Sequence, residues 1–172
     1  MAQVRENGDL KSVRIAIIAD CYPPMRSSGA VMLRDLAVEF KRFNHTPIVI
    51  IPDSTIESPI ERSIEREIEI VRIRSHKIKD VGYGFRVLSE FSMPFIMRRR
   101  LRQNNFFDLS LDGVIWYSPS IFHGPLINAL KKVNGCKAYL ILRDIFPEWA
   151  VDMGIMGRGL AYKFFKVIEG YQ

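Results

Sequence analysis

The sequence contains few of the residues and motifs that would reveal a chemistry directly. Its only two cysteines, Cys21 and Cys136, are too few for a zinc site or a disulfide scaffold, which favours a reducing compartment. Neither glycine-rich pattern of the dinucleotide-binding dehydrogenases and the P-loop enzymes occurs in it. It also has no Ser–His–Asp order and no cluster of metal ligands, which argues against a triad hydrolase and against a metal site.

Long apolar runs are missing as well. No stretch approaches the roughly 20 apolar residues that a membrane-spanning helix needs, and residues 1–11 lack the apolar core of a signal peptide. We therefore expect a cytoplasmic protein, which could still lie peripherally on the cytoplasmic face of the inner membrane. Residues 1–12 are expected to form a flexible lead-in to a single domain of residues 13–172.

What the sequence does contain is typical of a globular domain with a basic surface. Hydrophobic residues make up 48% of the chain and charged residues 26%, as in folded rather than disordered proteins. The net charge of +6 favours acidic partners such as nucleotides, phosphates, anionic lipids or nucleic acid.

Short apolar runs along the chain predict a parallel sheet. Three runs suit buried or central strands, a fourth suits a further strand, and a fifth segment with alternating polarity suits an edge strand. The strands are expected at Val13–Ala19, Ile48–Ile51, Leu111–Tyr117 and Ala138–Leu142, and the edge strand at Glu67–Arg74. We place the Ala138–Leu142 strand at the centre of the sheet, buried on both faces.

Amphipathic helical patterns fill most of the intervals between these strands. A first helix starts at a cap formed by Ser27 or Ser28, buries one apolar face through Phe43, and ends at Asn44. Further helices are expected over Tyr83–Arg102 (one helix or two, broken or kinked near Pro94), Ser120–Val133 and Gly159–Glu169. A loop or an irregular excursion is expected over Asp53–Arg66. Five strands alternating with helices predict a doubly wound, mainly parallel α/β domain of the Rossmann-like kind.

The loop after the first strand is a candidate binding site. It contains Asp20 and Tyr22, and then Ser28 and Gly29 just before a helix. A loop of small residues that leads into a helix N-terminus suits phosphate, and glycine lets the backbone approach a ligand closely. An ordinary capped helix start would explain the same pattern.

Polar residues also follow two later strands. Ser118 follows Leu111–Tyr117, and a charged segment with Arg143, Asp144 and Glu148 follows Ala138–Leu142. Ligands of open α/β sheets bind at the carboxyl ends of the strands, so these side chains and Asp20 could converge on one ligand. Alternatively, Arg143 and Asp144 pair with each other and close a loop.

Two further features have more than one interpretation. His123 could act as a base, although a histidine on a helix face is more often structural. A basic cluster, formed by Arg98, Arg99, Arg100 and Arg102, follows the apolar residues Phe91 and Phe95 and could rest on an anionic bilayer. A solvated helix face is the alternative, and nucleic acid is not an expected partner because no DNA- or RNA-binding motif accompanies the cluster.

Several of these segments together resemble a known family. They are Tyr22-Pro23-Pro24, Ser28-Gly29-Ala30, Tyr117-Ser118-Pro119 and Arg143-Asp144-Ile145-Phe146-Pro147-Glu148. From Val13 onwards the chain resembles the amino-terminal half of a family 4 (group 1) glycosyltransferase of the GT-B architecture. The subgroup that it resembles contains the sugar transferases of capsule, O-antigen and colanic-acid synthesis.

The resemblance implies a division of labour between two Rossmann-like domains that face each other across a cleft. The first domain mainly holds the acceptor, and the second holds the nucleotide-sugar donor for a retaining transfer without a metal or other cofactor. The Ser28–Gly29 loop would lie near the donor phosphates. Asp20, Tyr22, Ser118, Arg143 and Glu148 would line the binding cleft. Asp144 is the candidate catalytic residue.

The function implied is binding of the acceptor in surface-polysaccharide synthesis, where a sugar is transferred to a lipid-linked or polysaccharide acceptor. Two residues depart from the family pattern, since Ser28 stands in place of a loop glycine and Ser118 in place of a histidine. We expect the donor domain to lie outside these 172 residues, so the isolated chain should be inactive. The alternative is a non-catalytic binding subunit that pairs with a separate donor-domain protein or with the membrane.

Overall fold

The computed structural model describes residues 11–76, 83–117, 122–143 and 145–170. Most of the expected lead-in, residues 1–10, lies outside these ranges. The described chain forms one six-stranded sheet in the order β3-β4-β2-β1-β5-β6. Its strands are β1 (Arg14–Ile18), β2 (Thr46–Asp53), β3 (Ile60–Glu65), β4 (Ile68–Arg74), β5 (Gly113–Tyr117) and β6 (Lys137–Ile141). Every neighbouring pair is parallel except β3 with β4, which confirms the predicted α/β class.

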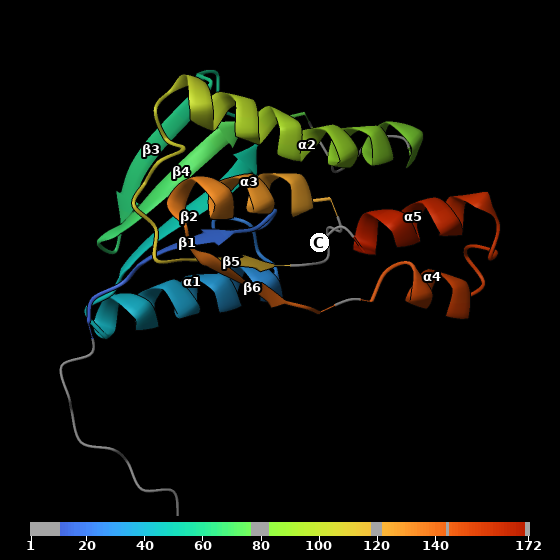
Figure 1. Cartoon of the computed structure of the whole chain (residues 1–172), viewed down its shortest axis with the longest axis horizontal. Helices are drawn as coiled ribbons and strands as arrows, with labels where there is room; N and C mark the ends of the chain where they lie inside the picture. The colour runs from blue at the N-terminus through green and yellow to red at the C-terminus, as the bar shows by residue number, and fades with distance from the viewer. Residues whose placement is uncertain (1–10, 77–82, 118–121, 144, 171–172) are drawn as a thin grey trace, which may run out of the picture.

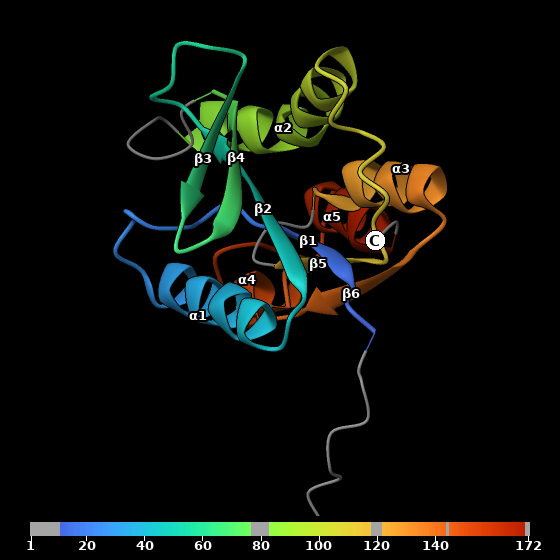
Figure 2. The same cartoon turned by 90° about the vertical axis from the view of Figure 1, so that its left-hand side faces the viewer.

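Helices cover both faces of this sheet (Figures 1 and 2). The helices are α1 (Ser28–Arg42), α2 (Tyr83–Gln103), α3 (Gly124–Asn134), α4 (Glu148–Asp152) and α5 (Leu160–Gly170). Helix α1 lies on one face, and α2 and α3 lie on the other. Helices α4 and α5 follow β6 and lie beyond the end of the sheet in Figure 1.

The core consists of two apolar layers that the strands separate. Along β1, Ile17 belongs to the layer under α1, whereas its neighbour Ile18 belongs to the layer under α2 and α3. Successive side chains of a strand point to opposite faces, so a strand covered on both faces must be apolar at every position. This is the physical reason why the sequence is apolar at every position from Ile15 to Ala19, after Arg14 at the start of the strand.

The sequence pattern was right about how the first helix begins and ends. Ser27 is the N-cap of α1, where its Oγ accepts a hydrogen bond of 3.2 Å from the backbone N–H of Ala30. Asn44 takes a φ of 61°, the left-handed conformation that follows a helix end. Phe43 does not lie on the buried face as predicted. It is the C-cap residue and its side chain is exposed, because the helix has already ended there.

The expected loop over Asp53–Arg66 is wrong in its second half, which forms the antiparallel strand β3. Its hairpin to β4 turns through Arg66 and Glu67, which have φ values of 52° and 62°. A two-residue turn with two positive φ values usually carries asparagine or glycine, and this one carries neither. Because β3 occupies the edge, β4 is an inner strand and not the edge strand that its alternation suggested.

The strand predicted at Ala138–Leu142, which is β6 in the structure, does not lie at the centre of the sheet as predicted. β6 lies at the end of the strand order and not at the centre, and Tyr139 on it is 69% exposed. A short apolar run indicates a strand but does not say how many neighbours that strand has. The strand predicted to end at Ile51 is longer than expected, since β2 continues through Pro52 to Asp53. Of the two arrangements considered for Tyr83–Arg102, one helix or two, the structure has one, and α2 contains Pro94.

Candidate functional site

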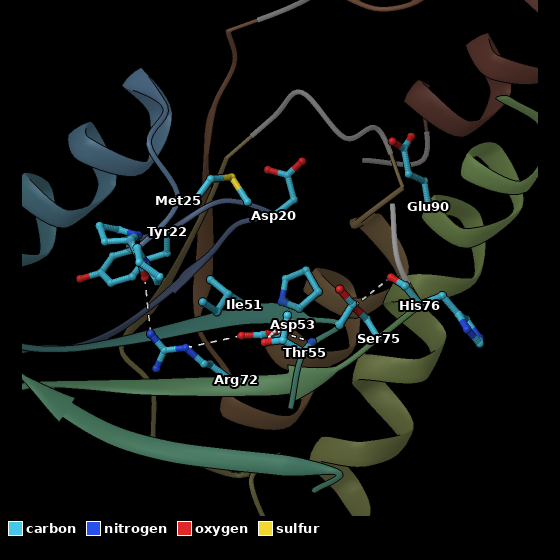
Figure 3. Close-up of a pocket in the computed structure, with 14 residues that line it drawn as sticks. Asp20, Tyr22, Met25, Ile51, Asp53, Thr55, Arg72, Ser75, His76 and Glu90 are labelled. Carbon is cyan, nitrogen blue, oxygen red and sulfur yellow. Dashed lines mark hydrogen bonds and ion pairs between the residues drawn. The ribbon is translucent and has the colours of Figure 1, made fainter. Parts of the chain in front are cut away.

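A cavity of about 300 Å³ lies at the carboxyl ends of β1, β2 and β4 (Figure 3). Asp20 follows β1, Asp53 is the last residue of β2, and Ser75 directly follows β4. The β1–α1 loop contributes Tyr22, and α2 contributes Glu90 from the side. The cavity therefore lies where the topology of an open parallel sheet places ligands.

Arg72 of β4 holds one wall of the cavity together. Its side chain is only 12% exposed, and its Nη2 donates to Glu65 Oε1 at 2.8 Å and to the carbonyl of Pro23 at 3.4 Å. Its Nε lies 3.7 Å from Asp53 Oδ2, and its Nη1 donates to Ser63 Oγ at 2.8 Å. One guanidinium thus connects the β3–β4 hairpin, the end of β2 and the β1–α1 loop at Pro23. The carboxylates of Asp53 and Glu65 balance its charge.

The floor of the cavity is a tight turn at the end of β2. Asp53 Oδ1 accepts hydrogen bonds from the Thr55 backbone N–H at 2.8 Å and from Thr55 Oγ1 at 2.7 Å. The Ser75 N–H donates to the Asp53 carbonyl at 2.8 Å, which fixes the chain after β4 against this turn. In Figure 3 the Asp20 and Glu90 side chains lie on one side of the opening, and Asp53, Thr55 and Ser75 lie on the other.

Burial raises the pKa of Tyr22, which lies beside this wall. Tyr22 is 4% exposed, and this burial, together with the nearby Glu65 carboxylate, raises the pKa of its hydroxyl above 10.0. The Tyr22 hydroxyl is therefore protonated at neutral pH and can act as a hydrogen-bond donor but not as a base.

A second cluster lies farther along the same edge of the sheet, where α1 begins. A Cβ atom on Gly29 would lie 2.8 Å from Tyr117 Oη and 3.1 Å from Cys21 Sγ, so only glycine fits there without a shift. Tyr117 is the last residue of β5, and its Oη accepts a hydrogen bond of 3.3 Å from Arg143 Nη1 just after β6. The contacts thus bring the start of α1 and the ends of β5 and β6 to one place.

The structure brings some of the predicted site residues to the cavity or to the cluster around Tyr117, and it places others elsewhere. Asp20 and Tyr22 line the cavity, and Gly29 and Arg143 both approach Tyr117, while Ser28 is exposed on the first turn of α1. Ser118 and Asp144 lie outside the described residues, so their binding and catalytic roles stay predictions.

Glu148 is placed differently, because it connects α4 to α5. Its Oε1 accepts from Tyr162 Oη at 3.2 Å and pairs with Lys166 Nζ at 2.7 Å. The hydrogen bond from Lys166 is the main cause of the lowered pKa of the Glu148 carboxyl. In the described structure this carboxylate holds two helices together.

The sequence interpretation missed several residues of the cavity, namely Asp53, Thr55, Arg72, Ser75 and Glu90. Two of them could have been found, since Asp53 and Ser75, like Asp20, are polar residues at the carboxyl ends of predicted strands. The others could not, because Glu90 comes from a helix far along the chain and Arg72 from the middle of a strand pattern. No group of three or more potential metal ligands occurs within the described ranges.

His123 is buried completely at the start of α3. Neither ring nitrogen has a hydrogen-bond partner among the described residues, and burial lowers its pKa to about 4. The imidazole is therefore neutral at physiological pH, and it is not among the residues that line the cavity.

The arginine cluster on α2 does not act as one surface. Arg100 Nη1 donates to the Pro59 carbonyl at 3.2 Å, and the Arg102 guanidinium lies over the Phe107 ring at 5.3 Å. Arg99 is exposed, whereas Arg98 is half-buried. Within the described ranges, no helix is both long enough and apolar enough to cross a membrane.

Comparison with known proteins supports the fold. No protein-family model and no curated protein matches the chain. Among solved structures, the apo structure of OtsA, a trehalose-6-phosphate synthase and GT-B glycosyltransferase, superposes with a TM-score of 0.54 at 11% identity. The superposition covers 92% of this chain but only 38% of OtsA. The chain therefore has a Rossmann-like fold similar to part of a GT-B enzyme, and it spans well under half the length of that enzyme.

Proposed function

We propose that this chain is the acceptor-binding domain of a retaining glycosyltransferase of the capsule, O-antigen and colanic-acid type. It would serve the transfer of a sugar from a nucleotide sugar to a lipid-linked or polysaccharide acceptor. The observation that supports this most is the shared edge of the sheet, where the cavity and the Gly29–Tyr117–Arg143 cluster both lie. The fold similarity to OtsA agrees with a place in such an enzyme.

The chemistry of the cavity suits a sugar ring. Carboxylate groups of Asp20 and Glu90 and hydroxyl groups of Thr55 and Ser75 surround it. The carboxylates can accept hydrogen bonds from sugar hydroxyls, and the hydroxyls can both donate to them and accept from them. Apolar surface from Met25 and the neighbouring prolines can contact the C–H faces of a ring. A polar opening with a few apolar walls is a common form of small-ligand site.

The cluster around Tyr117 suits the donor side. The N-terminus of α1 is positively polarised, and Arg143 adds a full positive charge at Tyr117. In our proposal this region, with Ser28 and Gly29, lies near the donor phosphates, and Asp144 carries the catalytic carboxylate. A second domain would supply most contacts to the nucleotide sugar, with no metal required. Turnover of nucleotide sugar by the 172-residue chain alone is therefore expected to be absent.

Binding of small glycosides tests the acceptor assignment. Methyl glycosides of common hexoses, titrated into labelled protein, should shift the amide resonances of Thr55, Ser75 and His76. A Ser75→Ala/Glu90→Gln variant should bind on the order of tenfold more weakly, because it lacks two hydrogen-bonding groups. A matched Ser92→Ala/Glu61→Gln variant, altered outside the cavity, should bind like the wild type.

Two results would contradict the proposal. One is the absence of binding by every glycoside in the panel, and the other is a set of shifts that maps away from the cavity. Robust turnover of a nucleotide sugar by the isolated chain would overturn the assignment of donor chemistry to a second domain.

One observation favours the alternative of a binding subunit. The α4–α5 segment exposes the large apolar side chains of Met153, Ile155, Leu160 and Val167, which are 61–86% exposed. Such a surface is typical of contact with another protein or domain. If transfer activity arises on mixing the chain with a separately expressed donor-domain polypeptide, and Leu160→Ser/Val167→Ser abolishes it, the subunit alternative is correct.

A further inference from the structure

The charged side chains of the cavity are divided unevenly between the two signs. Asp20, Asp53 and Glu90 bring three carboxylates to the lining, and Arg72 is the only arginine or lysine among the described lining residues. The chain as a whole carries a net charge of +6, so the cavity differs in sign from the rest of the molecule. A concave site lined by one sign of charge attracts ligands of the opposite sign and repels ligands of its own.

The guanidinium of Arg72 does not offset this excess for a ligand, because protein oxygens hold it in place. Its Nη2 donates to Glu65 Oε1 at 2.8 Å, and its Nε lies 3.7 Å from Asp53 Oδ2. Its Nη1 donates to Ser63 Oγ at 2.8 Å, and the side chain is only 12% exposed. Turning this group toward a ligand would leave the carboxylates of Glu65 and Asp53 without their partner, which is costly for partly buried charges. Arg72 therefore builds the wall and is not available to bind an anion.

Two other titratable side chains of the lining do not supply a positive charge to the opening either. The Tyr22 hydroxyl is uncharged at neutral pH, because burial raises its pKa. The His76 ring meets the Phe85 ring edge-on, with 6.5 Å between centroids. Figure 3 shows this imidazole turned away from the other lining side chains. The field in the opening is therefore set by carboxylates.

These carboxylates come from three different elements and lie on both sides of the opening. Asp20 follows β1 and Glu90 belongs to α2, and their side chains lie on one side in Figure 3. Asp53 ends β2 on the other side, where its Oδ1 accepts from the N–H and the Oγ1 of Thr55. A ligand that enters between the two sides thus meets negative charge on each of them.

The size of the cavity limits what can be placed between these groups. Its volume of about 300 Å³ is at the small end of the range for ligand pockets, which suits one sugar ring better than an oligosaccharide. Hydroxyl and amino groups of such a ring can donate hydrogen bonds to carboxylates. A carboxylate or phosphate group on the ring would instead stand against like charges, which disfavours binding.

We propose that the cavity selects its sugar by charge, with Asp20 and Glu90 as the specificity-determining residues. It accepts a neutral hexose or an amino sugar, and it rejects a uronic acid or a ring that carries phosphate. That the ligand is a sugar rests on the proposed function, whereas the selection by charge rests on the cavity alone. An amino sugar should bind best, because its ammonium group can form a charge-assisted hydrogen bond with a carboxylate.

Four methyl glycosides titrated into the labelled 172-residue chain test this selection. They are a hexoside, its 2-amino-2-deoxy analogue, the corresponding hexuronide and the hexuronamide, which has nearly the shape of the hexuronide but no charge. From the shifts of the Thr55 and Ser75 amides, the hexuronide should bind on the order of tenfold more weakly than the hexuronamide. The amino sugar should bind more tightly than the hexoside. Added salt should narrow both differences, because it screens charges that are open to solvent.

A pair of matched variants assigns the effect to the two carboxylates. Asp20→Asn/Glu90→Gln should reduce the tenfold preference for the hexuronamide to about twofold. The measured quantity is a ratio, so a general loss of contacts cancels. Asp35→Asn/Glu61→Gln removes the same two charges from exposed positions outside the cavity, and it should leave the preference unchanged. Glu90→Gln alone, on the surface of α2, gives a smaller change in the same direction if the double variant does not fold.

The inference is overturned if the hexuronide binds in the cavity as tightly as the hexuronamide, or if the control variant changes the preference as much as the cavity variant does. Failure of the proposed function looks different, because none of the four glycosides would then shift the cavity amides. In that case methylammonium and methyl phosphate, compared at equal ionic strength, still test the selection by charge. Methylammonium alone should shift the Thr55 and Ser75 amides, and an equal response to methyl phosphate overturns the inference.

Discussion

The sheet and the α4–α5 segment are both rich in apolar residues, but they use them in opposite ways. In β1 and β2, Ile17, Ile18 and Ile50 are completely buried. In α5 no residue is buried, and Leu160 is 86% exposed. The difference shows that an apolar pattern indicates a surface to be covered, while the arrangement of the elements decides whether this chain covers it. The predictions below test this contrast, beginning with the largest expected effect.

Truncation in the two regions should have very different costs. Ile50→Ala in β2 should lower the free energy of unfolding by about 4 kcal/mol, because it leaves a cavity between the sheet and its helices. Leu160→Ala in α5 should change it by less than about 0.5 kcal/mol, because the side chain is already in solvent. Chemical denaturation measures both. Similar losses for the two variants would contradict the contrast.

The buried His123 should make the stability of the packed region depend on pH. Its folded-state pKa is about 4 against 6.5 for the free side chain, so the unfolded chain takes up the proton first as pH falls. The contribution of the neutral imidazole is therefore complete above 6.5 and is lost as pH falls towards 4, a loss on the order of 3 kcal/mol. Denaturation across that window should show a steeper loss for the wild type than for His123→Leu, and parallel curves would refute the idea.

A methyl group at Gly29 should disturb the edge of the sheet. Gly29→Ala would place Cβ 2.8 Å from Tyr117 Oη, and the necessary shift should cost about 2 kcal/mol. Gly157→Ala is the matched control, because nothing lies within 4 Å of the added atom there. Adding Tyr117→Phe to Gly29→Ala should recover part of the loss, since the nearest atom is then gone. An undisturbed Gly29→Ala protein would show that the close approach is not maintained in solution.

The smallest effect is expected where α4 meets α5. Glu148→Gln removes the carboxylate charge that pairs with Lys166, at a site where both side chains are partly exposed. Salt and water weaken such a pair, so global stability should hardly change, while backbone amides of α5 should exchange faster. Because the pKa of Glu148 is lowered, the stabilisation by the Glu148–Lys166 pair is complete at pH values above the usual carboxyl pKa. It is lost as the pH falls through the lowered pKa of Glu148. Unchanged exchange in α5 would show that other contacts hold the helix.

Most of the fold was predictable because it follows from local patterns. The apolar runs at Ile15–Ala19 and Ile48–Ile51 are uninterrupted, and such runs occur where both faces of a strand are covered. The cap at Ser27 and the left-handed Asn44 are local chemistry as well. β3 was missed because its turn at Arg66 and Glu67 contains no glycine, asparagine or aspartate, so the sequence there does not indicate a hairpin.

The candidate site was predictable only in part. Asp20 and Gly29 follow the rule that polar and small residues after a parallel strand face a ligand. Arg72 and Glu90 belong to the site through contacts with residues that are distant in sequence, and no spacing signals such contacts. Glu148 shows the opposite. It is a charged residue after a predicted strand, but its carboxylate pairs with Lys166 of α5.

By itself the sequence determined the α/β class, the start and end of the first helix, and the loop that follows β1, since each depends on neighbours within a few residues. Only the tertiary structure decided the order of the strands, the position of β6 at the edge and the glycine requirement beside Tyr117. These features are distances between segments far apart in the chain, and they exist only once the packing of two helical layers on one sheet has brought those segments together.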